Sequence, residues 1–174
     1  MEIHIIRHIE PAIEKGICYG QTDVLLHDGC EKIHKQIAEN IDTDFSQIYS
    51  SPLLRCKLLA QEISKDVIYD IRLMEVNFGD WEMQKWDEIN EQEINIWMEN
   101  YIEKSPPKGE SLNDLIYRFK NFITEKKQDK KILIVAHAGI IRCAFHLFNK
   151  IKIDKIMMIK VEYGVIYKFN YKIT

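Results

Sequence analysis

The chain has 174 residues with 24 basic and 27 acidic side chains, which gives a net charge of −3. This balance differs from the strongly basic composition of nucleic-acid binders, so we expect no nucleic-acid partner. Hydrophobic residues make up 46% of the chain, enough for a single domain, residues 1–174, to bury a full core. No apolar run approaches the ~18 residues of a membrane span, and Arg7 comes too early for a signal peptide. We therefore expect a cytoplasmic protein without a membrane partner.

Cysteine and arginine usage add two further constraints. No C-x-x-C pair occurs, which argues against a zinc ribbon and a disulfide scaffold. We expect buried free thiols at all four cysteines, which are Cys18, Cys30, Cys56 and Cys143. Lysine outnumbers arginine 19 to 5, so the position of an arginine is more informative here than usual.

The first half of the chain alternates predicted strands and helices. Apolar, β-branched runs predict strands over residues 2–6, 47–50 and 67–70. Apolar spacing of three and four residues predicts a helix over 28–40. A second helix is expected over 51–64, with Ser51 as its N-cap and Pro52 in its first position. Residues 72–82 have no clear period and contain Gly79, so they predict an irregular loop of the kind that often holds sites.

The second half continues the alternation. We expect a helix over residues 86–102 and another that starts at Ser111, where Asp114 completes a capping box. The run KILIVA at 131–136 is the strongest buried-strand signal and leads into a helix that ends near Phe148. Two last strands, 156–162 and 165–171, are expected as a hairpin or an edge pair. The pattern predicts one α/β domain, a three-layer α/β/α sandwich with a mostly parallel sheet.

Five polar residues occupy positions where such a sheet binds ligands, beyond the carboxyl ends of its strands. His8 follows the first strand and His137 follows the KILIVA strand. Arg7 adjoins His8, and Arg55 falls in the first turn of a helix, where the dipole already favours an anion. Guanidinium groups bind phosphate bidentately, so these residues outline a phosphate pocket. Glu75, in the irregular loop, is placed to act as a general acid near such an anion.

Each of these residues has a plainer interpretation when taken alone. A histidine after a strand is more often a packing residue, and a helical arginine is more often solvated; only the joint placement favours a site. The other histidines lack this setting and are expected on the surface or in packing, namely His4, His27, His34 and His146. Trp81 is the tryptophan expected to line the site, because it shares the loop of Glu75. The G-x-S-x-G, P-loop and H-E-x-x-H signatures do not occur.

A set of short motifs resembles the histidine phosphatase superfamily, which has the phosphoglycerate-mutase-like fold. In chain order they are Arg7-His8, GICYGQTD at 16–23, SSPLLR at 50–55, LME at 73–75, FGDWE at 78–82, GES at 109–111 and VAHAGIIR at 135–142. They span nearly the whole chain. The 16–23 and 78–82 stretches look most like the α-ribazole phosphatase branch, which removes the phosphate from α-ribazole 5'-phosphate in cobalamin nucleotide-loop assembly.

The resemblance implies a role for each of the five candidate residues. His8 would be the nucleophile that becomes a phosphohistidine. Arg7, Arg55 and a protonated His137 would hold the phosphoryl group, and Glu75 would protonate the leaving alkoxide and then activate water. Phosphoryl transfer needs mainly positioning and charge stabilisation, which these side chains supply. The resemblance therefore implies a small phosphate ester as substrate and no metal or cofactor.

Some positions add to the family pattern or depart from it. Gln21 and Ala138 would contact phosphate or substrate. Ile9 replaces a usual glycine, and a β-branched residue cannot take a glycine-only conformation, so the phosphate contacts of this loop are expected to differ. The glycine after His137 is shifted to Gly139. A phosphoglycerate mutase, a broad sugar-phosphate phosphatase and an inactive phosphate-binding module stay open as alternatives, as does the oligomeric state.

Overall fold

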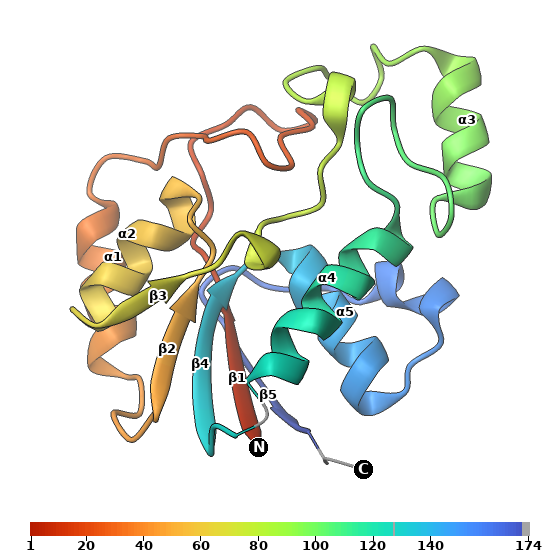
Figure 1. The fold of residues 1–174 in the computed structure, drawn as a ribbon. Coiled ribbons are helices and arrows are strands. Elements are labelled where there is room, and N and C mark those ends of the chain that lie inside the picture. The colour runs from red at the N-terminus through yellow and green to blue at the C-terminus, as the bar shows by residue number, and fades with distance from the viewer. Residues whose placement is uncertain (127, 172–174) are drawn as a thin grey trace.

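A mostly parallel sheet lies at the centre of the molecule (Figure 1). The computed structural model describes residues 1–126 and 128–171, and within them five strands form this sheet in the order β3-β2-β4-β1-β5. Strands β1 to β4 run parallel, whereas β5 is antiparallel to β1. The bounds are β1 Glu2–Arg7, β2 Gln47–Ser50, β3 Val67–Tyr69, β4 Lys131–Ala136 and β5 Ile166–Asn170. The predicted α/β class and mostly parallel sheet are confirmed.

Helices cover both faces of the sheet and complete three layers (Figure 1). Helices α1 (Cys30–Glu39) and α2 (Leu54–Ile63) lie on one face, and α4 (Leu112–Glu125) and α5 (Ala138–Asn149) lie on the other. A parallel sheet buried on both faces needs apolar side chains at every position, which explains the uninterrupted run in β4.

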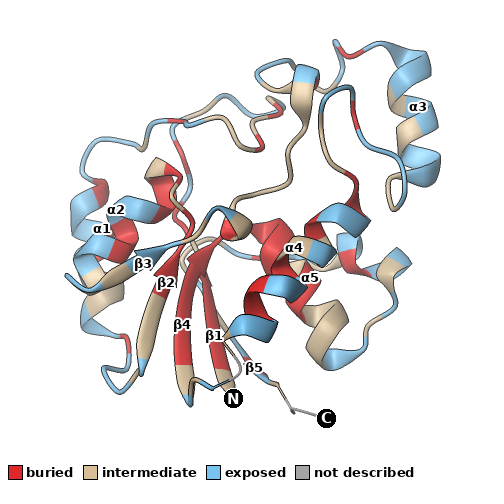
Figure 2. Ribbon diagram, in the orientation of Figure 1, coloured by how far each residue is buried: buried red, intermediate tan, exposed pale blue. Residues whose placement is uncertain are grey.

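The core is divided by the sheet into two apolar layers. In β4, Leu133 and Val135 join the layer under α1 and α2, while Ile132 and Ile134 join the larger layer under α4 and α5. Successive side chains of a strand point to opposite faces, so one six-residue strand supplies both layers. Figure 2 shows the consequence, because β1 and β4 are the most continuously buried strands.

Two helices start later in the structure than predicted. Helix α2 begins at Leu54 rather than near Ser51, because the hydroxyl of Ser51 accepts the N–H of Leu53 in a turn that precedes the helix. Helix α3 spans Glu91–Asn100 rather than 86–102, because the Asn90 side chain accepts the N–H groups of Gln92 and Glu93 and caps the helix there.

Helix α3 and helix α4 differ in how they are anchored. No residue of α3 is buried, and the helix lies apart from the sheet (Figure 2). Helix α4 starts with the predicted capping box, in which Ser111 and Asp114 each accept a backbone N–H of the other. The apolar face of α4 is buried in the core.

The predicted strand over residues 156–162 is wrong. Ile153–Met158 form a 3₁₀ helix in which Ile156 is fully buried, and the chain then passes over the end of β1. There the carbonyl of Val161 accepts a hydrogen bond from the Arg7 side chain, and Gly164 N–H bonds the Arg7 carbonyl. The apolar residues of this segment serve the core and the site rather than a ladder, so the terminal hairpin reduces to β5.

All four cysteines are buried and free, as predicted. Within residues 1–126 and 128–171, no helix is both long and apolar enough to cross a membrane.

Candidate active site

His8 and His137 meet at the carboxyl edge of the sheet. Strands β1 and β4 are neighbours, with Arg7 in register with Ala136, so the residues that follow them emerge side by side. The ring centroids of the two histidines lie 5.1 Å apart. Because β4 inserts between β1 and β2, the strand order reverses at this point, which is where such sheets bind ligands.

The ring of His8 is oriented by its own backbone. Its Nδ1 lies 2.6 Å from the carbonyl oxygen of Ile9, and because a carbonyl can only accept, Nδ1 carries the proton. The lone pair is therefore on Nε2. Burial, followed by the positive charge of Arg55, holds the pKa of His8 well below its usual value. A neutral imidazole with a free Nε2 lone pair is the form a nucleophilic histidine needs.

His137 contacts two side chains at this edge of the sheet. Its Nε2 lies 2.8 Å from the hydroxyl of Ser51 and 3.4 Å from the thiol of Cys56. Burial and then the neighbouring charge of Arg55 hold the pKa of His137 well below its usual value. The protonated ring expected when His137 holds a phosphoryl group stays a prediction. Arginine supplies fixed positive charge at this edge, and His137 adds a hydrogen-bonding ring.

Arg55 reaches this edge from the first turn of α2 and is fully buried. Its Nη2 donates to the carbonyl of Gly20 at 2.6 Å and its Nη1 to that of Thr22 at 3.0 Å. Its Nε is buried and has no hydrogen-bond partner among the described residues.

Arg7 is held in a similar way. Its Nη1 donates to Val161 at 2.5 Å, its guanidinium stacks 3.5 Å from the ring centre of Tyr163, and its buried Nε also has no partner in the described part of the chain. Unpaired buried donors are rare because they cost free energy. With Arg55, two such donors flank the histidine pair, an arrangement suited to an anion.

Glu75 is fixed against the start of α5. Its two carboxylate oxygens lie 3.1 and 3.2 Å from the N–H of Gly139, and one of them accepts the N–H of Val76 at 2.9 Å. A Cβ on residue 139 would lie 2.1 Å from Glu75 Oε1, so a larger residue would displace this carboxylate. The glycine displaced by one position after His137 is thus the seat of this carboxylate.

Glu82, in the same loop, makes a different set of hydrogen bonds. Its carboxylate accepts the N–H groups of Gln21 at 2.8 Å, Thr22 at 2.6 Å and Phe78 at 3.0 Å, together with the Thr22 hydroxyl. It therefore ties the 16–23 loop to the 78–82 loop. The predicted contact residue Gln21 donates its side-chain Nε2 to the carbonyl of Glu75 at 2.9 Å, so it also braces this loop.

A cavity of about 280 Å³ opens beside Arg7 and Glu75. Ala138 lines it, whereas His8, Arg55 and His137 do not. Its aromatic lining residues are Tyr19, Phe78, Trp86, Trp97 and Tyr101. Two further charged groups, Glu110 and Arg142, complete the polar part of the wall. The cavity wall therefore combines charged groups with several aromatic rings.

Trp81 does not line this cavity, contrary to prediction. Its side chain is buried in a cluster with Cys18 and Ile89, and its indole N–H points to Glu93 at 3.4 Å. Trp86 and Trp97 take its place, because the turn before α3 and the helix itself bring them over the cavity.

The sequence profile of the histidine phosphatase superfamily (branch 1) matches residues 3–173. The chain belongs to this superfamily. Phosphoserine phosphatase 1 of Hydrogenobacter thermophilus is 27% identical over 83% of this chain and 74% of its own length. The 2,3-bisphosphoglycerate-dependent phosphoglycerate mutase of Rhizobium etli is 26% identical over 79% and 75%. The crystal structure of the α-ribazole phosphatase from Shigella flexneri superposes with a TM-score of 0.86 at 23% identity, covering 99% of this chain and 91% of that one.

Members of the histidine phosphatase superfamily are phosphatases and mutases that act on small phosphate esters. In this member, Ile9 stands where glycine is usual, yet its backbone is unstrained. Positive φ angles among the described non-glycine residues occur only at Met83, Lys108 and Lys150. Ile9 instead contributes the carbonyl that orients His8.

Several residues of this histidine phosphatase site were not singled out from the sequence. Tyr163 stacks on Arg7, Ser51 contacts His137, and Arg142 lines the cavity. Arg142 lies within the 135–142 motif, and the scarcity of arginine was a signal that could have found it. No sequence pattern points to the stacking of Tyr163, which depends on how the segment after the 3₁₀ helix folds back.

Proposed function

We propose that this chain is a phosphomonoesterase that works through a phosphohistidine at His8. The observation that carries the proposal is the neutral, Nδ1-protonated His8 flanked by Arg7 and Arg55, whose buried Nε groups have no partner among residues 1–126 and 128–171. The two N–H groups would donate to oxygens of the transferring phosphoryl group. A phosphate dianion between two guanidinium groups would offset the cost of burying them.

In the first step, Nε2 of His8 forms a bond to phosphorus as the ester oxygen leaves. Positive charge that develops on the ring is stabilised by the hydrogen bond from Nδ1 to the Ile9 carbonyl. Glu75, which lines the cavity, gives its proton to the departing alkoxide.

In the second step, Glu75 now acts as a base. It takes a proton from a water molecule, whose oxygen attacks phosphorus and breaks the phosphorus–nitrogen bond. Inorganic phosphate leaves, His8 returns to its neutral form and Glu75 is protonated again. One group can serve both steps because it lies on the side where first the alkoxide and then the water stands.

Binding requires a local rearrangement. His8 is only 2% exposed, and the ring of Tyr163 lies 5.6 Å from it. The Tyr163 ring also covers the Arg7 guanidinium. A phosphoryl group competes with Tyr163 for Arg7, so we expect substrate to displace this side chain.

The substrate that we propose is α-ribazole 5'-phosphate. Its benzimidazole base is flat and apolar, which suits the aromatic walls that Phe78, Trp86 and Trp97 give the cavity. The fold-level likeness to an α-ribazole phosphatase is consistent with this choice.

A second candidate substrate is an ester whose alcohol carries a carboxylate, such as phosphoserine or phosphoglycerate. Arg142 in the cavity wall and the curated relatives favour it.

A labelled phosphate test separates an enzyme from a binding module. The protein is reacted briefly with a ³²P-labelled ester, and the bound label is then treated with acid and with base. A phosphohistidine loses its label in acid and keeps it in base, whereas a label on Ser or Thr survives acid. We expect the phosphohistidine in the wild type and none in His8→Ala; an unlabelled, inactive wild type would contradict the proposal.

Substrate preference is tested separately. Among α-ribazole 5'-phosphate, phosphoserine and 3-phosphoglycerate, the first should give the highest kcat/KM. The reverse order would favour the carboxylate-bearing esters, and phosphate transfer between positions of phosphoglycerate would identify a mutase.

A further inference from the structure

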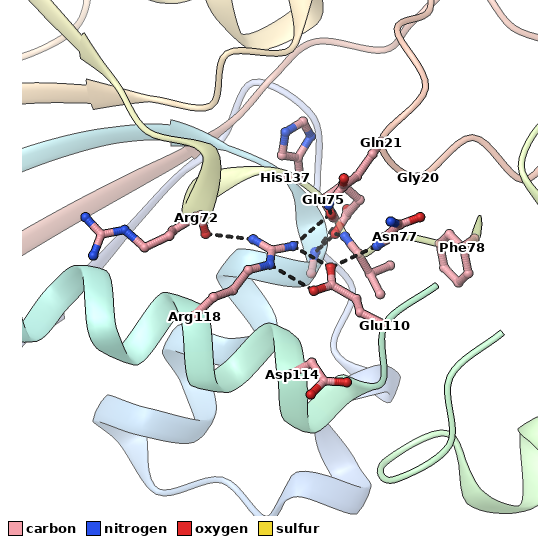
Figure 3. A network of polar contacts seen from close by, with 12 residues as sticks. Gly20, Gln21, Arg72, Glu75, Asn77, Phe78, Glu110, Asp114, Arg118 and His137 are labelled. Atoms are coloured by element: carbon pink, nitrogen blue, oxygen red, sulfur yellow. Dashed lines mark hydrogen bonds and ion pairs between the residues drawn. The ribbon is translucent and has the colours of Figure 1, made fainter. Parts of the chain in front are cut away.

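An arginine–glutamate pair lies directly behind Glu75 (Figure 3). Arg118 projects from α4, and Glu110 lies just before that helix. Their side chains are 17% and 15% exposed, so water screens the pair less than an ion pair on the surface. Neither residue belongs to the phosphate-holding set of the proposed mechanism.

The guanidinium of Arg118 joins both ends of the turn that leads to Glu75. Its Nη1 donates to the carbonyl of Arg72 at 2.7 Å, and its Nη2 donates to the carbonyl of Glu75 at 2.8 Å. A planar group with fixed donor directions thereby sets the distance between these two carbonyls. An ammonium group cannot reproduce this geometry, because its three donors radiate from one atom.

Glu110 orients Arg118 and extends the contact beyond Glu75. Its two oxygens accept Nε at 3.0 Å and Nη2 at 2.6 Å, which is a bidentate pair. The oxygen that accepts Nη2 also accepts the backbone N–H of Asn77 at 2.9 Å (Figure 3). The pair thus holds the chain before Glu75, at Glu75 and two residues after it.

We propose that Arg118 and Glu110 are positioning residues that keep the Glu75 carboxyl where it can donate its proton. The proposal rests on the proposed role of Glu75 as general acid. With its backbone held by Arg118 and its carboxylate seated on Gly139, Glu75 has little freedom to drift. Displacement of a catalytic group by about 1 Å can cost about 10²-fold in rate, so such bracing matters for turnover.

The test compares leaving groups. We would measure kcat and KM with an alkyl phosphate, which needs the acid, and with p-nitrophenyl phosphate, which does not. Arg118→Lys should lower kcat for the alkyl ester by about 10- to 10²-fold and that for the aryl ester by less than about 3-fold. In a Glu75→Gln background the same substitution should add little, because the group it positions is already absent.

Glu125→Gln is the matched control. Glu125 also lies on α4 and also ties that helix to the same turn, through two bonds to the Arg72 side chain, but it contacts neither Glu75 nor Glu110. This variant should lower Tm slightly, and it should not change kcat for one ester more than for the other. Glu110→Gln is the second variant, in case Arg118→Lys does not fold, and it should show the same selectivity as Arg118→Lys.

The outcomes separate this proposal from the one it rests on. If Glu75→Gln shows no dependence on the leaving group, the acid assignment fails and the positioning role fails with it. If Glu75→Gln is selective but both Arg118→Lys and Glu110→Gln slow the two esters equally, the pair is only structural and this proposal alone is overturned.

Discussion

The carboxylate of Glu75 is seated on the backbone N–H of Gly139, 3.1 and 3.2 Å from its two oxygens. Gly139 is the second residue of α5, and His137 is the N-cap of that helix. One helix start therefore holds both the histidine proposed to contact phosphate and the carboxyl proposed to protonate the leaving group. The spacing between these two functions is set by a single rigid element.

The Gly139→Ala variant tests this seat. The added methyl group would lie 2.1 Å from Glu75 Oε1, so the carboxyl must move. We expect kcat for alkyl phosphates to fall by about 10²-fold or more, with a smaller loss for p-nitrophenyl phosphate. Steady-state kinetics with both esters checks this. Unchanged kinetics in a folded variant would show that the seat does not position the acid.

The Arg55→Lys variant tests the proposed phosphate contact. Lysine keeps the charge, but its donors radiate from one atom and cannot reproduce the planar fork that bonds Gly20 and Thr22 and leaves Nε free of any partner within residues 1–126 and 128–171. We expect kcat/KM to fall by about 10²-fold, as for loss of one preorganised donor. Arg72→Lys, which alters a partly exposed pair with Asp70, serves as the control. Wild-type kinetics for Arg55→Lys would leave Arg55 a purely structural role.

The Glu82→Gln variant separates the two carboxylates of the 75–82 loop. Glu82 accepts backbone N–H groups from Gln21, Thr22 and Phe78, and an amide NH₂ cannot replace an accepting oxygen. We expect loosening of the 16–23 loop and equal losses with alkyl and aryl phosphates. Glu75→Gln should instead be selective for the alkyl ester. If the selectivity appears with Glu82→Gln, the acid has been assigned to the wrong residue.

Buried neutral histidines also predict a pH-dependent stability. The pKa values of His8 and His137 are lowered below 6.5 in the folded state. The unfolded chain therefore binds more protons below that pH, and the folded state loses stability as pH falls. The slope should be about 1.4 kcal/mol per pH unit for each histidine. Denaturant unfolding without phosphate between pH 7.5 and 5, compared with His137→Asn, measures it. An identical slope in the variant would contradict the assignment for His137.

Local sequence patterns were sufficient to predict the elements whose residues suit only one kind of secondary structure. The run 131–136 forms β4 at the predicted bounds, and Ser111 caps α4 as expected. Residues 156–162 were ambiguous because apolar β-branched side chains serve a strand and a buried 3₁₀ turn equally well. Tertiary contact decided between them, since Ile156 packs in the core and Val161 supplies a carbonyl to Arg7.

The order of strands and polar residues along the chain was enough to predict which residues gather at the site, because carboxyl ends of neighbouring parallel strands share one edge of a sheet. That rule places His8 beside His137, and the scarcity of arginine made Arg7 and Arg55 conspicuous. Folding, in contrast, sets the pKa of His137, because burial and the charge of Arg55 lower it. Folding also decided which aromatic rings line the cavity and which arginine braces Glu75. Irregular loops have no periodicity, so the direction of their side chains is fixed only by the contacts they make once folded.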